Sequence, residues 1–257
     1  MHASRTFNEL RELLEEKTVQ YGSADFFVPT DPISIPARYQ KKEDIEISGF
    51  LVATIAWGQR KSIISNGLKL CALMDDAPHD FVMHHQASDL KRLEGFVHRT
   101  FNDSDLLFFV SALQHLYQKG LGLEGAFQHE GDLGQKISSL RNHFMAVPHL
   151  SRSLKHIANP LKGSSAKRLC MYLRWMVRQP GIGCDFGIWS SMHPSELYLP
   201  LDVHSGRIAR KLGLLHRTQD DWRAVEELTH QLRAFDPADP CKYDYALFGM
   251  GAFESMP

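Results

Sequence analysis

The sequence predicts an all-α protein made of two helical lobes. Apolar residues recur at helical spacing through most of the 257 residues, and no segment shows the sustained apolar–polar alternation that a strand needs. A hydrophobic content of 43% is enough to bury a sizeable core in a chain of this length. We expect one lobe over residues 44–199 and a second formed by residues 1–43 together with residues 200–257.

The first elements follow from spacing and from the residues that end helices. A helix is expected from Thr6 to about Val19, and the three prolines between Phe27 and Tyr39 then predict an extended linker, since proline removes a backbone N–H and restricts φ. Asp44 is placed to cap the next helix, which the break at 58–60 ends.

Later helices are predicted in the same way. The helix that begins near Lys61 should turn Ile64, Leu68 and Cys71 inward. After Gly163, the predicted helix buries Leu169, Tyr172, Leu173 and Met176 and leaves its basic residues on the opposite face. Further helices are expected around residues 81–85, 104–118, 134–144, 203–212, 222–232 and 243–253.

Composition excludes several classes of protein. A net charge of −1 and a pI near 6.9 argue against binding to nucleic acid through overall charge, so such contact needs a local basic patch. The four cysteines are scattered with no short ligand spacing, which excludes a zinc site and an iron–sulfur cluster, and three of them have apolar neighbours typical of core thiols. No run approaches the roughly 20 apolar residues of a membrane span, and no signal peptide precedes the first helix, so we expect a cytoplasmic protein without cofactor.

Asp202 and Lys167 are the two residues whose position suggests chemistry. An aspartate that opens a helix is most often an N-cap, and spacing alone favours that structural role for Asp202. The same placement would keep the carboxylate ionised and able to stabilise a cation that develops on a sugar. Lys167 follows a turn of small residues, so it is a surface lysine, a phosphate contact or, if desolvated among cations, a nucleophilic amine.

The basic residues around this pair indicate a groove that binds nucleic acid or, in the simpler interpretation, a helix surface that is exposed to solvent. The N–H groups of Gly163, Ser164 and Ser165 form a candidate anion site. A metal site on Asp202 and His204 is disfavoured because no third ligand stands at a recognisable spacing. Trp57, Trp175 and Trp189 are predicted core residues, one of which could instead stack on a base. The basic side chains on the two helices are Arg168, Arg174, Arg178, Arg207, Arg210 and Lys211.

Several segments resemble the helix-hairpin-helix DNA glycosylase superfamily that contains endonuclease III. LKGSSAKRL is similar to its hairpin LPGVGxKTA, with Lys167 on the lysine, and LDVHSGRIARKLGL is similar to VDTHVxRVxxRLGL, with Asp202, His204 and Arg207 on its aspartate, histidine and arginine. LVATIAWGQRKSI resembles LxxxxLSAQxTD, which places Gln59 on the glutamine that fills the gap left by a flipped base, with Arg60 beside it. The middle of the chain, residues 75–159, has no counterpart.

The resemblance implies a fold, a partner and an activity. It implies two helical lobes with a cleft between them, double-stranded DNA as the partner of a monomer, and excision of a damaged, perhaps oxidised, base through Lys167 and Asp202, with or without strand cleavage. It implies DNA contacts at Gln59, Arg60, Gly163, Ser164, Ser165, Arg168, Arg174, His204 and Arg207.

Three departures from the family pattern bear on this hypothesis. Ser165 replaces the second hairpin glycine, the connector between Lys167 and Asp202 is longer than in endonuclease III, and the four closing cysteines of that protein are absent. The alternatives are a non-catalytic nucleic-acid-binding protein that keeps the fold, a metal-dependent hydrolase or nuclease, and a structural helical protein.

Overall fold

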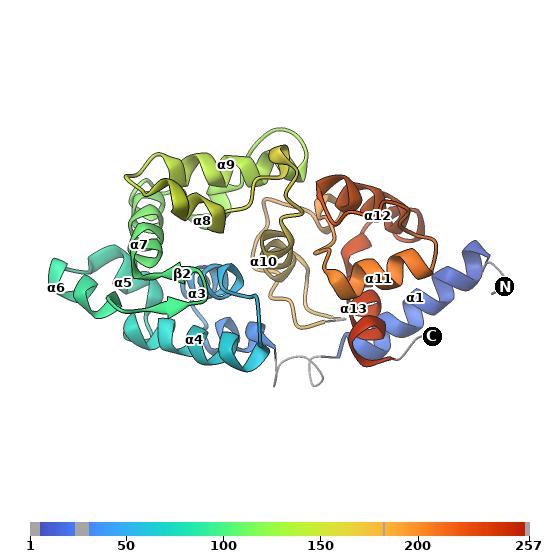
Figure 1. Cartoon of the computed structure of the whole chain (residues 1–257), viewed down its shortest axis with the longest axis horizontal. Coiled ribbons are helices and arrows are strands. Elements are labelled where there is room, and N and C mark those ends of the chain that lie inside the picture. The colour runs from blue at the N-terminus through green and yellow to red at the C-terminus, as the bar shows by residue number, and fades with distance from the viewer. Residues whose placement is uncertain (1–5, 24–30, 182, 255–257) are drawn as a thin grey trace. The chain divides into compact units, whose positions relative to one another are not determined.

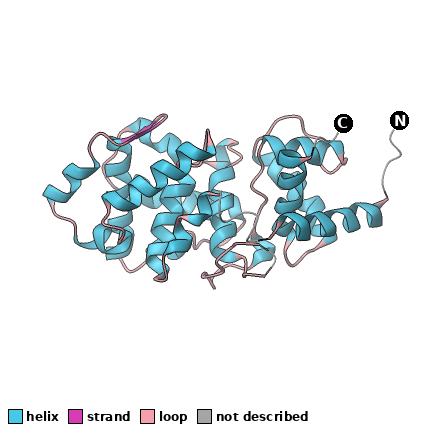
Figure 2. Cartoon of the chain, turned by 90° about the horizontal axis from the view of Figure 1, so that it is seen from below, coloured by secondary structure: helices cyan, strands magenta, loops and turns pink. Residues whose placement is uncertain are grey.

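The computed structural model describes residues 6–23, 31–181 and 183–254, and over these ranges the protein is mostly helical, as predicted (Figure 1). Figure 2 shows helices through nearly the whole chain. Over the same residues, the only strands are β1 (Val97–His98) and β2 (Phe101–Asn102), which pair as an antiparallel hairpin. The sequence did not predict this hairpin, because strands of two residues are too short to show an alternating pattern.

The chain divides into two compact units. One unit is Thr30–Leu161, and the other combines Met1–Pro29 with Lys162–Pro257. These boundaries differ from the predicted lobes at both ends of the middle unit, since residues 30–43 belong with the middle of the chain and residues 162–199 belong with the chain ends. The ion pair between Arg174 of α10 (Lys167–Val177) and Asp244 of α13 (Asp244–Phe253) gives a physical reason for the second difference, because it joins these segments within a single core.

The unit Thr30–Leu161 is built around α3 (Lys42–Thr54), whose residues from Ile45 onward are all buried. A helix that is buried on every side needs neighbouring elements on every side. The Phe50 ring lies 5.8 Å from that of Phe109 and 5.5 Å from that of Phe144, which forms the aromatic centre of this core. The other helices of this unit are α4 (Arg60–Leu73), α5 (Pro78–His84), α6 (Ala87–Leu90), α7 (Asp103–Gln118), α8 (Gly122–Ala126) and α9 (Leu133–Met145).

Two predictions about the start of this unit are wrong. Residues 31–39 are not an extended linker but contain two 3₁₀ helices, η1 (Pro32–Ser34) and η2 (Pro36–Arg38), each of which begins with a proline. Proline suits the first position of a helix, where its missing N–H has no partner to lose. The N-terminal part of the predicted linker, 27–30, lies outside the described residues. Asp44 does not cap α3, which begins after Lys41, but accepts the backbone N–H of His79 at 2.8 Å.

The remaining 3₁₀ turns lie in loops between helices. In this unit they are η3 (Lys91–Leu93) and η4 (Ser151–His156), and η5 (Pro160–Lys162) stands at the boundary between the units.

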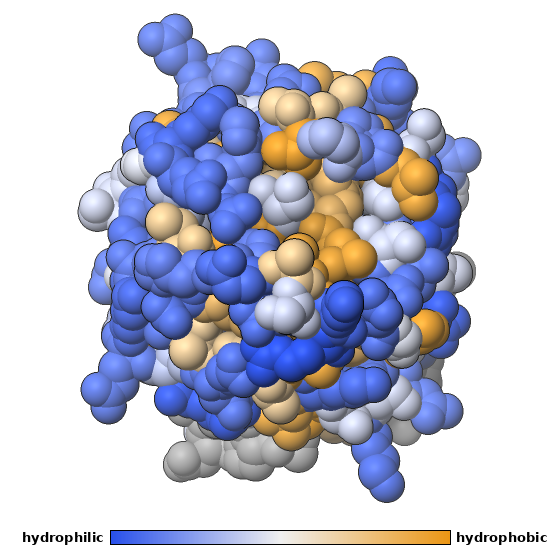
Figure 3. All heavy atoms as spheres, turned by 90° about the vertical axis from the view of Figure 1, so that its left-hand side faces the viewer, coloured by the Kyte–Doolittle hydropathy of each residue, from blue (hydrophilic) through white to orange (hydrophobic). Residues whose placement is uncertain are grey.

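The surface of this unit is largely hydrophilic. Figure 3 shows the face at the α6 end, where hydrophobic residues gather in a central band among polar ones. Leu68, Val97 and Leu150 are among the large apolar side chains exposed on the unit. The prediction that Leu68 points inward is therefore wrong, whereas Cys71 on the same helix is buried as predicted.

In the second unit, glycines of α13 allow close helix packing. Besides α10 and α13, the described residues of this unit form α1 (Phe7–Tyr21), α11 (Val203–Lys211) and α12 (Trp222–Phe235), with the 3₁₀ helices η6 (Pro194–Glu196) and η7 (Pro240–Tyr243) between helices. At Gly249 an added Cβ would lie 2.2 Å from the Tyr21 ring, and at Gly251 it would lie 2.9 Å from the His204 backbone oxygen. Glycine at these positions lets α13 approach both α1 and α11 closely, which brings Asp244 near the start of α11.

Among the described residues, the helices are too short or too polar to cross a bilayer.

Candidate active site

Lys167 is the first residue of α10, directly after a tight turn. Gly163 has φ +90° and Ala166 has φ +49°, so two left-handed residues reverse the chain before the helix begins. The carbonyl of Ala166 accepts the N–H groups of Leu169 and Cys170 at 2.9 Å each, which starts the helix. This geometry places the Lys167 side chain at the rim of the unit, where it is 32% exposed.

Asp202 is the N-cap of α11, as its sequence position predicted. One carboxylate oxygen, Oδ1, accepts the backbone N–H groups of His204 and Ser205 at 2.9 Å each. The other oxygen, Oδ2, lies 3.8 Å from the Lys167 Nζ, and the Asp202 side chain is 18% exposed. The structure therefore brings Lys167 and Asp202 together, 35 positions apart in the chain.

This pair combines an amine with a carboxylate that backbone hydrogen bonds hold in place, and both side chains are partly exposed. A separation of 3.8 Å is an ion-pair contact rather than a hydrogen bond, so the amine is not locked onto the acid. Both groups stand at helix N-termini, where the aligned N–H groups favour a nearby anion. The arrangement suits a nucleophilic amine with an acid–base partner, or a contact to an anionic ligand.

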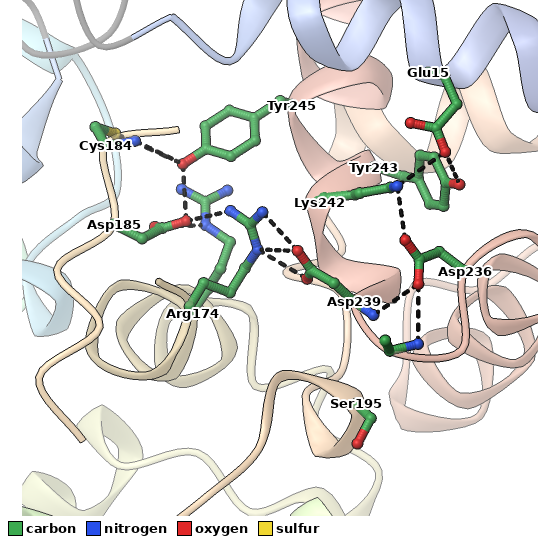
Figure 4. A network of polar contacts seen from close by, with 12 residues as sticks. Glu15, Arg174, Cys184, Asp185, Ser195, Asp236, Asp239, Lys242, Tyr243 and Tyr245 are labelled. Carbon is green, nitrogen blue, oxygen red and sulfur yellow. Dashed lines mark hydrogen bonds and ion pairs between the residues drawn. The ribbon is translucent and has the colours of Figure 1, made fainter. Parts of the chain in front are cut away.

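A buried ion network is built around Arg174 and Arg178, which follow Lys167 by about two and three helical turns (Figure 4). Arg174 donates to Asp185 at 3.2 Å and to Asp244, while Arg178 donates to the other Asp185 oxygen at 2.5 Å and to both oxygens of Asp239. Asp185 also accepts the Tyr245 hydroxyl at 3.0 Å. Arg174 and Arg178 are only 5% and 3% exposed, so the network forms part of the core.

The buried network raises the pKa values of both Asp244 and Arg174, for different physical reasons. Burial raises the pKa of Asp244 to about 6, although the Arg174 guanidinium opposes the rise; Asp202 adds to it and Lys167 reduces it. For Arg174, burial acts to lower the pKa, but the carboxylates led by Asp185 outweigh it and raise the pKa above its ordinary range. Asp244 is thus within electrostatic reach of the Lys167–Asp202 pair, and its Oδ1 also accepts the Ser205 hydroxyl at 3.5 Å.

The predicted phosphate contact at Arg174 conflicts with the structure. Its guanidinium is enclosed, paired with Asp185 and Asp244, and stacked 4.4 Å from the centre of the Tyr245 ring. Arg178, predicted on the same exposed basic face, is buried as well. Helical spacing placed these arginines opposite the apolar face, but the loop after α10 folds back over them, with the Phe186 N–H donating to the Trp175 carbonyl at 2.7 Å.

His204 and Arg207 use their polar atoms within the unit. The Nδ1 of His204 lies 3.0 Å from the carbonyl oxygen of Gly251, and the Arg207 guanidinium donates to that same oxygen at 2.6 Å. Both residues therefore fasten α11 to the end of α13. Burial lowers the pKa of Arg168 to about 10, which indicates that its charge is partly withdrawn from solvent. The DNA contacts predicted for His204, Arg207 and Arg168 stay predictions.

The turn before α10 is exposed and fixed to α12. Gly163 and Ser164 are exposed, and the Gly163 carbonyl accepts the N–H of Trp222 at 3.1 Å. The Ser164 hydroxyl accepts the Ala166 N–H at 3.3 Å, so one of the N–H groups at this helix start already has a partner. Ser165 is partly exposed. A bound phosphate at this turn stays a prediction, as do the DNA contacts of Gln59 and Arg60, which belong to the other unit.

Sequence reasoning missed Asp185 and Asp244. Asp244 lies in YDYALFGM, where one acid among apolar residues signals a buried, paired charge, because an unpaired carboxylate could not be enclosed there. Over the described residues, no group of three or more His, Cys, Asp or Glu side chains is arranged to hold a metal ion.

Comparison with known proteins gives one match. The family described as "protein of unknown function (DUF2400)" matches residues 31–253. The chain belongs to this family. No curated protein and no solved structure matches the chain. The region matched to DUF2400 contains Lys167, Asp202, Asp244 and the whole buried network, so the candidate site is part of the family domain.

Proposed function

We propose that the protein is a DNA base-excision enzyme in which Lys167 is the nucleophile and Asp202 its acid–base partner. The observation that carries the proposal is the 3.8 Å separation between the Lys167 Nζ and the Asp202 Oδ2, with both side chains partly exposed. An amine and a carboxylate at this distance can exchange a proton through one water molecule, or directly once they approach to hydrogen-bond distance.

The proposed reaction begins when the Lys167 ammonium gives a proton to Asp202. The free amine attacks C1′ of an extruded nucleotide, the C1′–N bond breaks, and the base leaves with that electron pair and takes the proton held by Asp202. The new C1′–Nζ ammonium returns a proton to Asp202, which passes it to the ring oxygen O4′ as the C1′–O4′ bond breaks and the iminium between Nζ and C1′ forms. Asp202 then takes a C2′ proton, the C3′–O bond breaks with its electron pair leaving on the 3′ phosphate, and water adds at C1′ to release the lysine and an unsaturated aldehyde.

The same residues support the stabilisation of charge in this reaction. Asp202 keeps one oxygen on the α11 N–H groups and turns the other toward the amine, so the carboxylate is held in place before substrate arrives. The exposed turn at Gly163 lies directly before Lys167 and supports the binding of a backbone phosphate beside the reacting sugar.

The test is borohydride trapping on duplexes that carry oxidised bases or an abasic site. Wild-type protein should form a covalent adduct that migrates with protein and DNA together, and Lys167→Gln should form none. Asp202→Asn should reduce adduct formation at least ~100-fold, in the range of a lost acid–base group. Lys162→Gln is the matched control, since this exposed lysine lies just before the same turn.

An absence of adduct from wild type over a broad panel of lesions would contradict the proposal. So would equal adduct yields from wild type and Lys167→Gln, which would place the amine elsewhere.

A second candidate is a non-catalytic nucleic-acid-binding protein. The observation that favours it is that helix capping by itself accounts for the conformation of Asp202. This candidate predicts DNA affinity that falls steeply with salt, is unchanged in Asp202→Asn and is accompanied by no adduct.

A further inference from the structure

Three segments of the Thr30–Leu161 unit that are distant in sequence converge beside Trp57. They are residues 57–61, 98–102 and 152–156, and we call this surface the Trp57 corner. The Nε2 of His98 lies 3.1 Å from the Trp57 carbonyl, the indole stacks on His156 at 5.9 Å, and Arg152 donates to the Thr100 carbonyl at 3.0 Å. These contacts join all three segments.

The corner is basic although its unit is neutral. Residues 30–161 contain 14 Lys and Arg and 14 Asp and Glu, a net charge of zero. The three segments of the corner contain no acid, and they carry Arg60, Lys61, Arg99, Arg152 and Lys155. The two acids next along the chain are already engaged: Asp105 is buried and accepts Arg152 at 3.1 Å, and Asp103 accepts the Gly95 N–H at 2.8 Å.

Arg99 is the most unusual residue of the corner. It occupies the tip of the β1–β2 hairpin with φ +56°, a conformation that costs a side chain roughly 1–2 kcal/mol, yet it is exposed. Its guanidinium lies over Gly58, where an added Cβ would be 2.9 Å from the Arg99 Nη1. The two-residue turn of the hairpin accounts for the positive φ, and it leaves the exposed arginine at the tip beside Gly58, in the segment that also carries Trp57 and Lys61.

Trp57 supplies the other half of the recognition chemistry. Of the four tryptophans, it alone is partly exposed, since Trp175, Trp189 and Trp222 are 1%, 2% and 6% exposed. A basic surface around an accessible indole fits a polyanion whose charges alternate with aromatic groups, which describes a nucleic-acid strand.

We propose that the Trp57 corner binds a single nucleic-acid strand, with its phosphates on Arg99, Lys61 and Lys155 and a base against Trp57. The inference rests on the nucleic-acid-binding part of the proposed function and not on the chemistry of Lys167. It adds two segments, 98–102 and 152–156, to the predicted contacts at Gln59 and Arg60.

The experiment is a titration of labelled (dT)20 with full-length protein at several salt concentrations, followed by anisotropy and by tryptophan fluorescence. The test variant combines Arg99→Asn with Lys155→Gln. Asparagine tolerates positive φ better than arginine, so Arg99→Asn removes a charge without adding backbone strain. The matched control combines Lys91→Gln with Lys119→Gln, which removes the same charge from exposed positions outside the corner.

Wild-type protein should bind (dT)20 with quenching of the indole, and the corner variant should bind at least ~10-fold more weakly, with a salt slope reduced by about 1–2. The control variant should match wild type to within about twofold. Inorganic polyphosphate should compete without quenching the indole, because it has charge but no bases. RNA and duplex DNA, as further probes, distinguish the kinds of strand.

Equal affinities of wild type and the corner variant would overturn this inference and leave the proposed function in place. Quenching by polyphosphate equal to that by (dT)20 would overturn the base contact. Binding through the corner without a Lys167 adduct would support the inference and contradict the proposed chemistry. No binding of any nucleic acid at low salt would overturn both.

Discussion

Helix α10 carries two kinds of ion pair that differ in almost every physical respect. At its first residue, Lys167 meets Asp202 at 3.8 Å in a partly exposed contact. Farther along, Arg174 and Arg178 meet Asp185 and Asp244 in an enclosed network, with Asp239 at its partly exposed edge. A loosely paired, accessible group is free to react or bind, whereas a charge that is buried and fully paired holds the fold together.

The largest expected effect comes from Arg174→Gln. Removal of this guanidinium leaves the buried Asp244 carboxylate without its cation, so the free energy of unfolding should fall by about 3–5 kcal/mol. Urea denaturation followed by circular dichroism measures the change. Arg223→Gln, an exposed arginine of α12, is the control and should change stability by less than about 0.5 kcal/mol. A similar, small loss for both variants would show that the network is not structural.

The pH dependence of stability tests the network a second way. The folded pKa of Asp244, about 6, is above the roughly 3.9 of an unfolded aspartate, so the folded state binds the extra proton between these values. Stability due to this group should therefore be greatest below pH ~4 and fall by ~2–3 kcal/mol as pH rises through about 6.

Asp244→Asn provides the comparison that isolates this residue. The difference in unfolding free energy, wild type minus variant, should decrease from pH 4 to pH 6.5 and then level off. An increase with pH over that range would mean that Arg174 dominates and that the folded pKa is depressed.

Two substitutions of Asp202 distinguish its role as a helix cap from its proposed chemical role. Asp202→Ala removes the acceptor for the N–H groups of His204 and Ser205 and should cost about 1 kcal/mol, measured as a lower melting temperature. Asp202→Asn should be close to wild type in stability, because asparagine caps helices about as well. If Asp202→Asn also keeps full adduct formation, Asp202 is only a cap.

The smallest effect on stability is expected for Lys167→Gln. Its ion pair with Asp202 is long and partly exposed, so the loss should be below about 1 kcal/mol in chemical denaturation. The same variant should lose the covalent adduct entirely. A loss of several kcal/mol would instead place Lys167 with the structural residues of α10.

Much of the fold could be predicted from sequence because helices have a local signature. The spacing of apolar residues located α1, α3 and α4, and Asp202 was correctly placed as the residue before its helix. The errors lie where distant segments decide the outcome. The 3₁₀ turns at Pro32 and Pro36 pack on the core of their unit, and the β1–β2 hairpin is shorter than any periodic pattern.

The same distinction between local sequence signals and contacts of distant segments applies to the candidate site. The sequence by itself determined which residues stand at the starts of α10 and α11, because turns and caps depend on neighbours in the chain. Only the tertiary structure decided that Lys167 faces Asp202 at 3.8 Å while Arg174, on the same helix, is enclosed by Asp185 and Asp244. The physical reason is that burial and charge pairing depend on segments that fold back from far along the chain, and helical periodicity records only which residues share a face.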